Sequence, residues 1–347
     1  MNAHAVRAGA KALAGMAAIT IALTGSAHAQ TGGNLPAKVA ELASAAKQEG
    51  EVTFYASCPE PIAAAVAKGF EEQFGIHANM LRLVTTELQI RYARELQAGA
   101  QSADAIIVSH GDGFAEKLIK DGLMVDPQNA GIPALDAYPT KLFKQGAAII
   151  GAEALGFAYN TDLVQEKDVP KDWPDLADPK WKGKLLVVDP VTSVGNTLPL
   201  LMIQEKYGDA AIQGIAANVY RLTPGIVPNF EALAAGEGSI GITSLASLAK
   251  PMAAKGAPVA HVTLSFAPLL QHSLGLTAKS PHPKAQALFA WYMMVGEGQK
   301  ILNDPERWSR ASPVTGENMP KEGVEMDNSL LPKADALYKL FGTSKKK

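Results

Sequence analysis

Residues 173–197 read W-P-D-L-A-D-P-K-W-K-G-K-L-L-V-V-D-P-V-T-S-V-G-N-T. The four apolar residues 185–188 lie between a lysine and an Asp-Pro pair, which is typical of a short strand buried on both faces. A small, hydroxyl-rich loop follows, and the apolar run from Leu198 predicts a helix after it. The stretch therefore predicts a strand, a polar loop and a helix start. Such a helix start directs free backbone N–H groups and the positive end of the helix dipole at whatever lies there.

Three residues of this loop, Ser193, Asn196 and Thr197, are candidate ligand-binding residues. The alternative interpretation is that they only cap the helix, because Ser, Asn and Thr side chains commonly accept hydrogen bonds from first-turn N–H groups. The loop by itself favours capping. The rest of the chain supplies the argument for ligand binding.

Strands and helices alternate in the first part of the chain. Strands are expected at 52–56, 78–84 and 105–108, and a polar loop and an amphipathic helical run follow each of them. This alternation predicts a doubly wound α/β sheet with right-handed crossovers, in which ligands bind beyond the carboxyl ends of the strands. The candidate ligand-binding residues expected at that edge are Ser57, Cys58, Thr85, Thr86, Ser109 and His110.

The second part of the chain continues with further strands. Apolar and β-branched runs predict strands at 148–150, 155–160, 239–243, 259–265 and 273–277. The first two are expected to pair around a turn. Tyr159 lies near the end of the second strand and Ser244 directly follows the third, so both join the candidate ligand-binding residues.

Four motifs resemble one protein family. The pattern Trp-x-Asp-Leu-x-Asp-Pro-x-Trp-x-Gly-Lys at 173–184, followed by a strand that ends in Asp-Pro, is similar to periplasmic solute-binding proteins of ABC importers. The nearest group binds ferric ion, thiamine, phosphonates or sugar phosphates. Gly-Phe-Ala-Tyr-Asn at 156–160, Pro-His-Pro at 281–283 and Gly-x-Gly-Gln-x-x-Leu at 296–302 resemble the same family, in the same order along the chain.

The resemblance implies a two-lobed α/β periplasmic-binding-protein fold of type II. Each lobe would be a doubly wound, mostly parallel sheet, and the ligand cleft would lie between the lobes. Residues 31–150 and 265–302 are expected to form the first lobe and residues 155–264 the second. The C-terminal segment 303–347 is expected to pack on either lobe.

The function implied by the resemblance is transport. The protein would capture a small polar or anionic organic solute by hinge closure and deliver it to an inner-membrane ABC permease, as a monomer and without a cofactor. A ferric-iron carrier is the first alternative. Ferric-binding relatives supply adjacent tyrosines after the strand that matches 239–243, but Ser244 and Leu245 stand there in this chain. Because Fe(III) prefers anionic oxygen donors, no metal ligand is assigned, and only iron ligation without a tyrosine pair stays open.

An exported enzyme is the second alternative. Cys58 is expected near a helix start, which lowers a thiol pKa, and His110 is expected at the same edge of the sheet. A Cys/His pair is a nucleophile arrangement, but no third, orienting residue is evident, and a lone cysteine often only packs. No catalytic residue is therefore assigned.

Composition limits the function classes. The 347 residues are 47% apolar and 6% aromatic, and the formal net charge is −2. This length is sufficient for two lobes with a core each. The charge argues against a nucleic-acid partner, which requires a basic face. Cys58 is the only cysteine, so no intramolecular disulfide is expected.

The first 29 residues are predicted to be a signal peptide. Two basic residues precede an apolar run at 12–23 that is short for a membrane span, and A-H-A at 27–29 fits a cleavage site. Cleavage after Ala29 leaves a mature chain that begins at Gln30. No other long apolar run exists in the sequence, so the mature protein is expected to be soluble in the periplasm.

Overall fold

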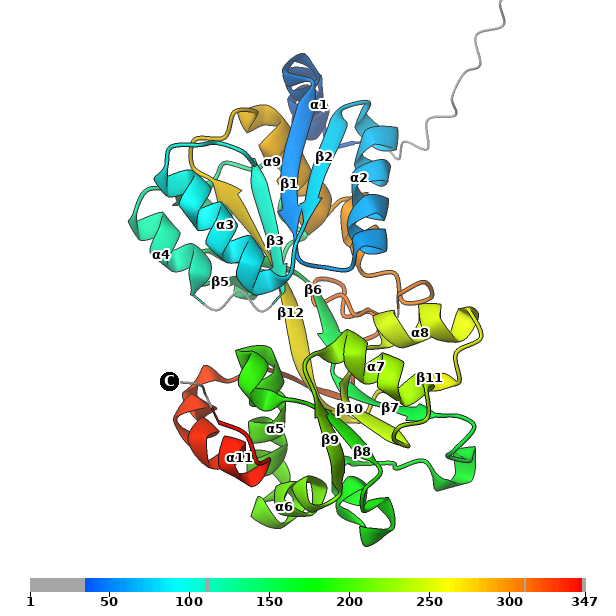
Figure 1. Ribbon diagram of the computed structural model, residues 1–347. Helices are drawn as coiled ribbons and strands as arrows, with labels where there is room; N and C mark the ends of the chain where they lie inside the picture. Colours follow the sequence, from blue (N-terminus) through cyan, green and yellow to red (C-terminus); the bar gives the residue numbers. More distant parts are fainter. Residues whose placement is uncertain (1–34, 110–112, 309, 345–347) are drawn as a thin grey trace, which may run out of the picture. The chain divides into compact units, whose positions relative to one another are not determined.

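The computed structural model describes residues 35–109, 113–308 and 310–344. The predicted signal peptide and His110 lie outside the described residues. Within the described residues the chain forms two mixed sheets with helices on their faces (Figure 1). No helix in these ranges has the length and apolar character that a membrane span requires.

The first sheet has the strand order β2-β1-β3-β12-β6-β5, and β4 and β13 also pair with β12. Its strands are β1 (Glu51–Ala56), β2 (His77–Arg82), β3 (Ala105–Ser109), β4 (Met124–Val125), β5 (Phe143–Lys144), β6 (Ala147–Ala154), β12 (Phe266–Thr277) and β13 (Glu322–Glu325). The helices in these parts of the chain are α1 (Ala37–Glu49), α2 (Glu60–Phe74), α3 (Thr85–Gln97), α4 (Phe114–Lys120), α9 (Pro283–Met294) and α10 (Glu297–Leu302).

The second sheet has the order β11-β7-β10-β8-β9. Its strands are β7 (Gly156–Asn160), β8 (Leu185–Val188), β9 (Val219–Thr223), β10 (Ile240–Ser244) and β11 (Val259–Val262). The helices in this part are α5 (Val194–Tyr207), α6 (Asp209–Ala217), α7 (Ile226–Ala234) and α8 (Ala246–Ala254), and α11 (Ala334–Leu340) joins them from the C-terminal segment. The buried strand expected at 185–188 is confirmed as β8.

Both sheets are mixed, which corrects the expectation of mostly parallel sheets. β1 runs parallel to β2 and β3, and β8 runs parallel to β9 and β10. However, β12 runs antiparallel to β3 and β6, and β7 runs antiparallel to β10 and β11. The reason is the direction of approach: β12 first meets β3 at His272, opposite Ser109 where the parallel strand β3 ends, so it runs the opposite way.

β6 and β7 do not pair around a turn, and that prediction is wrong. Only Leu155 separates the two strands, yet β6 belongs to the first sheet and β7 to the second. Their hydrogen-bond partners differ: β6 pairs with β5 and β12, and β7 pairs with β10 and β11. The chain therefore passes from one sheet to the other in almost continuous extended conformation.

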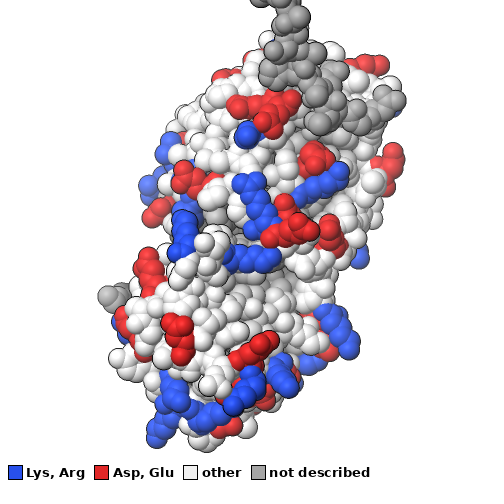
Figure 2. Space-filling model, turned by 90° about the vertical axis from the view of Figure 1, so that its right-hand side faces the viewer, with Lys and Arg blue, Asp and Glu red and all other residues white. Residues whose placement is uncertain are grey.

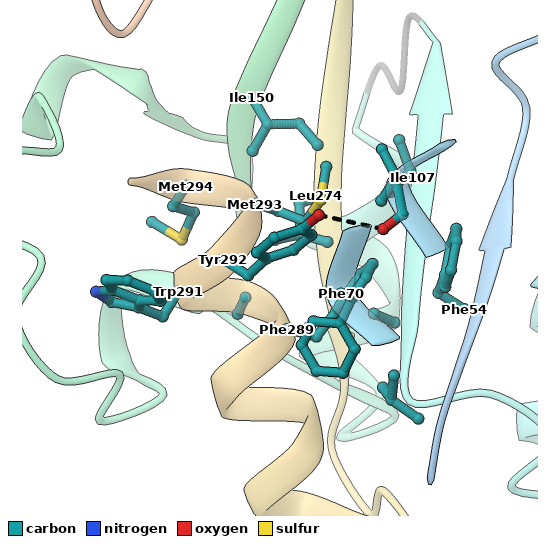
Figure 3. Packing of buried hydrophobic residues seen from close by; sticks show 14 of the residues in the cluster. Phe54, Phe70, Ile107, Ile150, Leu274, Phe289, Trp291, Tyr292, Met293 and Met294 are labelled. Atoms are coloured by element: carbon teal, nitrogen blue, oxygen red, sulfur yellow. Dashed lines mark hydrogen bonds between the residues drawn. The ribbon is translucent and has the colours of Figure 1, made fainter. Parts of the chain in front are cut away.

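The first sheet packs on a core rich in aromatic residues (Figure 3). The rings of Phe54 in β1 and Phe289 in α9 stack with their centroids 4.8 Å apart, and Phe70 of α2 meets Phe289 edge-on. Tyr292 of α9 donates its hydroxyl hydrogen to the Val66 carbonyl at 3.2 Å. Almost every residue of α9 is buried, so this helix closes the core against β1 and fixes the first sheet.

The second sheet has its own core, to which the C-terminal segment contributes. Trp173, the first residue of the stretch 173–197, is buried and donates its Nε1–H to the Phe266 carbonyl at 2.9 Å. Leu337 and Tyr338 of α11 pack into the same cluster as α5. Farther up the chain, β13 pairs with β12 of the first sheet. The described part of the C-terminal segment therefore contacts both sheets.

Candidate functional site

Two of the predicted site residues meet at the edge of the first sheet. Ser57 directly follows β1 and Ser109 ends β3, and these strands are parallel neighbours. The Ser109 N–H donates to Ser57 Oγ at 2.8 Å, and Ser57 Oγ–H donates to Ser109 Oγ at 3.2 Å. Ser57 is buried and Ser109 is half-buried. The structure thus brings together two hydroxyl groups from loops that lie 52 residues apart in the sequence.

The corresponding edge of the second sheet carries the start of α5. Ser193 precedes this helix and is exposed, but its side chain makes no capping hydrogen bond. Gly195 lies in the first turn, and a methyl group added to its Cα would meet nothing closer than Ser193 Oγ, at 3.8 Å. The helix start is therefore open to a ligand group on this side.

The side chains of Asn196 and Thr197 make hydrogen bonds within the protein that the sequence did not predict. Asn196 Nδ2 donates to Thr192 Oγ1 at 2.9 Å. Thr197 is fully buried, and its hydroxyl lies 2.7 Å from the Pro190 carbonyl and 3.0 Å from the Tyr338 hydroxyl. Neither side chain caps the helix in the expected way. Thr197 instead packs α5 against the C-terminal helix.

The edges of the two sheets approach each other along the passage from β6 to β7. His272 of β12 pairs with Ser109 on one side and with Gly151 of β6 on the other. Five residues later, Gly156 of β7 pairs with Ser244 at the end of β10. Five residues of extended strand span about 17 Å. Gly151 and Gly156, which pair with these two edges, are therefore no more than about 17 Å apart.

A buried carboxylate lies in the middle of this passage. Glu153 Oε1 is 3.1 Å from Arg310 Nη1 and 3.3 Å from His272 Nε2, and Oε2 accepts a short hydrogen bond from the Ser247 hydroxyl of α8. All four side chains are buried. Ser109 Oγ in turn lies 3.0 Å from His272 Nδ1. Hydrogen bonds and the close contact between His272 and Glu153 thus join the edge of the first sheet to α8 of the second.

The protonation states of this cluster follow from burial and pairing. Burial alone would raise the pKa of Glu153, but the Arg310 guanidinium, His272 and Ser247 together hold it below its usual value. Burial lowers the pKa of His272 to about 4; Arg310 acts in the same direction and Glu153 opposes it. At neutral pH Glu153 is therefore an anion and His272 is a neutral ring.

Sequence reasoning missed Glu153, His272 and Arg310. One signal was available: Glu153 is the only charged residue in the apolar run 147–159, and an isolated carboxylate in a buried strand requires a partner. The identity of that partner was not predictable, because Arg310 lies 157 residues farther along the chain.

The end of β10 is strained. Thr243 has φ 66° although its side chain is β-branched, and its buried hydroxyl has no hydrogen-bond partner among the described residues. Ser244, which follows, is buried, and its Oγ lies 2.8 Å from His261 Nδ1. Burial lowers the pKa of His261 to about 4. Ser244 is thus oriented by a neutral histidine.

The other predicted site residues occupy different surroundings. Thr85 is half-buried and Thr86 exposed in the first turn of α3. Cys58 is 1% exposed, and burial raises the pKa of its thiol to about 11. Tyr159 is half-buried in β7 and packs against the second core. His110 lies outside the described residues.

A pocket of about 530 Å³ lies next to the passage between the sheets. α8, β11 and the C-terminal segment line it, and its polar or charged residues are Lys250, His261, Thr263 and Asn318. None of the predicted ligand-binding residues lines it. In residues 35–109, 113–308 and 310–344 no group of three or more His, Cys, Asp and Glu side chains is placed to hold a metal ion.

Solved structures share this fold at low sequence identity. The substrate-binding protein of an ABC transporter from Agrobacterium tumefaciens is 18% identical with a TM-score of 0.69, over 84% of this chain and 94% of that one. Iron-bound HitA from Pseudomonas aeruginosa is 18% identical with a TM-score of 0.60, over 84% and 98% of the two chains. AfuA from Actinobacillus pleuropneumoniae, with fructose-6-phosphate bound, is 20% identical with a TM-score of 0.59, over 84% and 97%.

Sequence comparison leads to the same group. A curated relative, an uncharacterized protein of Haemophilus influenzae, is 32% identical over 96 residues, and the match spans 25% of this chain and 28% of that protein. The two-sheet architecture with crossing strands is that of periplasmic binding proteins. Residues 101–334 match the family described as bacterial extracellular solute-binding protein, and because this match covers more than half of the sequence, the chain belongs to that family.

Proposed function

We propose that this protein is the substrate-binding component of an ABC importer, and that it captures a small polar or anionic organic solute and delivers it to a membrane permease. Solute capture occurs between the two sheets, and closure takes place about the strands that cross between them. Family membership supports transport, and ABC transporter proteins are among the structural relatives. The nature of the solute is argued from the residues of this chain.

The observation that carries the proposal is the position of the open start of α5. This helix begins at the carboxyl end of β8, beside Ser244 at the end of the parallel neighbour β10. Gly195 leaves its first turn free of side-chain bulk. Free N–H groups and the helix dipole at such a site favour an oxyanion without needing a cationic side chain. A carboxylate, phosphate or phosphonate group of the solute is therefore expected there.

A thermal-shift screen with and without added solute tests this assignment. A ligand that binds only the native state stabilises it by RT ln(1 + [L]/Kd), about 2.7 kcal/mol at a hundredfold excess over Kd. Phosphate esters, phosphonates and carboxylates are expected to raise the melting temperature more than neutral sugars or amines. Native mass spectrometry of the protein as purified then identifies any solute that it retains.

A matched pair of variants locates the oxyanion. Gly195→Ala adds one methyl group to the open turn of α5, where nothing hinders it, so the fold is retained while the ligand is displaced. Ala210→Ser adds one atom to an exposed position in the first turn of α6 and serves as the control. Weaker anion binding in Gly195→Ala alone supports the assignment. Equal binding by both variants, or stabilisation only by neutral or cationic compounds, contradicts it.

Ferric iron is the competing cargo, since iron-bound HitA is among the structural relatives. Ser244 and Leu245 occupy the positions expected for a tyrosine pair, so we expect no tyrosinate-to-iron charge-transfer band when ferric citrate is added. A coloured complex at stoichiometric iron would show that the cargo is iron and not an organic solute.

Binding without catalysis is part of the proposal. Cys58 is buried and its pKa is raised, which disfavours the thiolate that nucleophilic catalysis requires. Turnover of a candidate substrate that disappears in Cys58→Ser would favour an exported enzyme instead.

We further propose that the protein acts as a periplasmic monomer without a nucleic-acid partner. Acidic and basic side chains are intermixed over the face in Figure 2, with no single-sign field of the kind that phosphate backbones need. Cleavage after Ala29 would release a mature chain that begins at Gln30. N-terminal sequencing of the exported protein tests the cleavage site, and a retained Met1 would refute it. Size-exclusion chromatography with light scattering tests the monomer.

A further inference from the structure

The hydrogen bonds at the edge of the first sheet run in one direction. Glu153 is ionised, so its oxygens can only accept. His272 Nε2 lies 3.3 Å from Glu153 Oε1 but makes no hydrogen bond, and a lone pair on Nε2 would be repelled by this anion. The neutral ring therefore carries its hydrogen on Nε2, and Nδ1 is an acceptor. Ser109 Oγ, 3.0 Å from Nδ1, must then donate its hydrogen to the ring. This series of contacts therefore runs from Ser109 through His272 to the buried carboxylate.

The same order fixes the hydroxyl of Ser57. Because the hydrogen of Ser109 Oγ is directed at His272, that oxygen accepts from Ser57 Oγ–H at 3.2 Å. Ser57 Oγ also accepts the Ser109 N–H at 2.8 Å. A hydroxyl has one hydrogen and two lone pairs. Both hydrogens are therefore used inside the protein, and each serine oxygen keeps one free lone pair.

Glu153 is held in the ionised, oriented state that this arrangement needs. Arg310 Nη1 at 3.1 Å and the Ser247 hydroxyl both donate to it, and the cluster is buried on all sides. Arg310 lies on the segment after α10, and Ser247 lies in the first turn of α8. The carboxylate of Glu153 is thus held by two segments that are far apart in the sequence.

We infer that the Ser57–Ser109 edge is an acceptor site, which binds a hydrogen-bond donor of the solute such as a hydroxyl or ammonium group, and that Glu153 is the positioning residue that sets this polarity. The inference rests on the proposed function, because it assumes that the solute reaches this edge. It adds a second chemical requirement: the oxyanion faces α5, and a donor group faces the first sheet.

The tautomer of His272 tests the inference without any ligand. Two-dimensional ¹⁵N–¹H spectra of the histidine-labelled protein at pH 7, with the His272 signals assigned by their loss in His272→Gln, are expected to show a neutral ring protonated at Nε2. A ring protonated at Nδ1 would donate to Ser109 and release the serine hydrogens outward, and that result would overturn the inference. A doubly protonated ring would overturn it equally.

Three probes that share an oxyanion test the ligand side. Phosphoethanolamine carries an ammonium donor, propyl phosphate carries neither donor nor acceptor on its chain, and 2-oxopropylphosphonate carries only an acceptor. We expect phosphoethanolamine to bind about tenfold more tightly than the other two, as one charge-assisted hydrogen bond allows. Tighter binding of the ketone would overturn the inference while leaving the oxyanion assignment intact. Failure of all three to bind would refute the proposed solute class, and the His272 tautomer would still decide the polarity of the edge.

Variants of Ser109 and Glu153 distinguish an effect on the solute preference from a purely structural effect. Ser109→Thr keeps the hydroxyl and is expected to keep the preference for phosphoethanolamine, whereas Ser109→Ala is expected to lose it. Glu153→Gln removes the anion that holds the ring hydrogen on Nε2, so signals of the Nδ1–H form are expected and the preference should fall about tenfold. An unchanged tautomer in a folded Glu153→Gln protein would refute the positioning role. If this variant does not fold, the two Ser109 variants and the wild-type tautomer decide.

Discussion

The hydroxyl oxygens of Thr197 and Tyr338 lie 3.0 Å apart and join the first turn of α5 to α11. The two residues are 141 positions apart in the sequence, and both side chains are buried. A residue that looked available to a ligand is therefore part of the packing that fixes the helix start. The proposed solute contact at this helix is therefore expected from the backbone of the first turn and from the exposed Ser193.

We expect Thr197→Val to lower the free energy of unfolding by about 1–3 kcal/mol, because it leaves the buried Pro190 carbonyl without its donor. Tyr338→Phe should cost about 1 kcal/mol. Urea unfolding of both variants and of the double variant gives the coupling between the hydroxyls. Neither change should alter solute affinity by more than about twofold; a large loss of affinity at constant stability would make Thr197 a ligand contact.

The stability of the protein is expected to fall as the pH is lowered below neutrality. An unfolded histidine has a pKa of about 6.5, and His272 in the folded protein has a pKa of about 4. Between these values the unfolded chain binds a proton that the folded ring excludes. The stabilisation is therefore fully present above pH 6.5 and is lost as the pH falls to 4, at up to about 1.4 kcal/mol per pH unit.

Urea unfolding at pH 7, 5.5 and 4.5 measures this slope. Glu153 adds a loss in the same direction at lower pH, because its folded pKa lies below the unfolded value of 4.5. In His272→Gln the slope between pH 6.5 and 4.5 should become flatter by the contribution of one proton. An equal slope in wild type and variant would contradict the neutral, buried ring.

Gly156 is expected to tolerate no side chain. A methyl group at this position would lie 2.0 Å from the Val262 carbonyl oxygen, which is backbone and cannot move aside. Gly156→Ala should therefore lower the free energy of unfolding by roughly 3 kcal/mol. Gly225→Ala is the matched control, because the nearest atom there is 3.7 Å away. Similar losses in the two variants would show that the close strand approach at Gly156 is not what requires glycine.

The thiol of Cys58 is expected to react slowly. It is 1% exposed, and burial raises its pKa to about 11, so the reactive thiolate is scarce at neutral pH. Labelling with a disulfide reagent should be at least about a hundredfold slower in the native protein than in urea, because the unfolded thiol titrates near 8.5. Rapid native labelling at pH 7 would restore Cys58 as a candidate nucleophile.

Local patterns predicted the strands that are apolar along their whole length. The runs at 52–56, 105–108 and 185–188 became β1, β3 and β8, since burial on both faces leaves a continuous apolar signal. β9 was missed, because it is an edge strand with exposed Tyr220 and a polar Arg221. The lobe boundaries expected from the sequence remain predictions.

The candidate site was predictable only in part, because local patterns do not show contacts between residues far apart in the sequence. Ser57 and Ser109 could be placed together because parallel strands end at one edge of a sheet. Glu153 and Arg310 could not, because their pairing depends on how the C-terminal segment returns past β6. The local loop predicts ligand contact or helix capping for Thr197, but its partner Tyr338 lies in a helix near the end of the chain.

The order in which the strands leave the ribosome differs between the two sheets. All strands of the second sheet lie within residues 156–262, whereas the first sheet needs β12, which stands between β3 and β6 and follows the whole second sheet in the sequence. Until residues 266–277 are available, β3 and β6 have unpaired edges facing each other. Closure of the first sheet thus depends on contacts of long sequence separation, which fold slowly and leave edges open to aggregation. Nascent chains that end before Phe266 should therefore need a chaperone most.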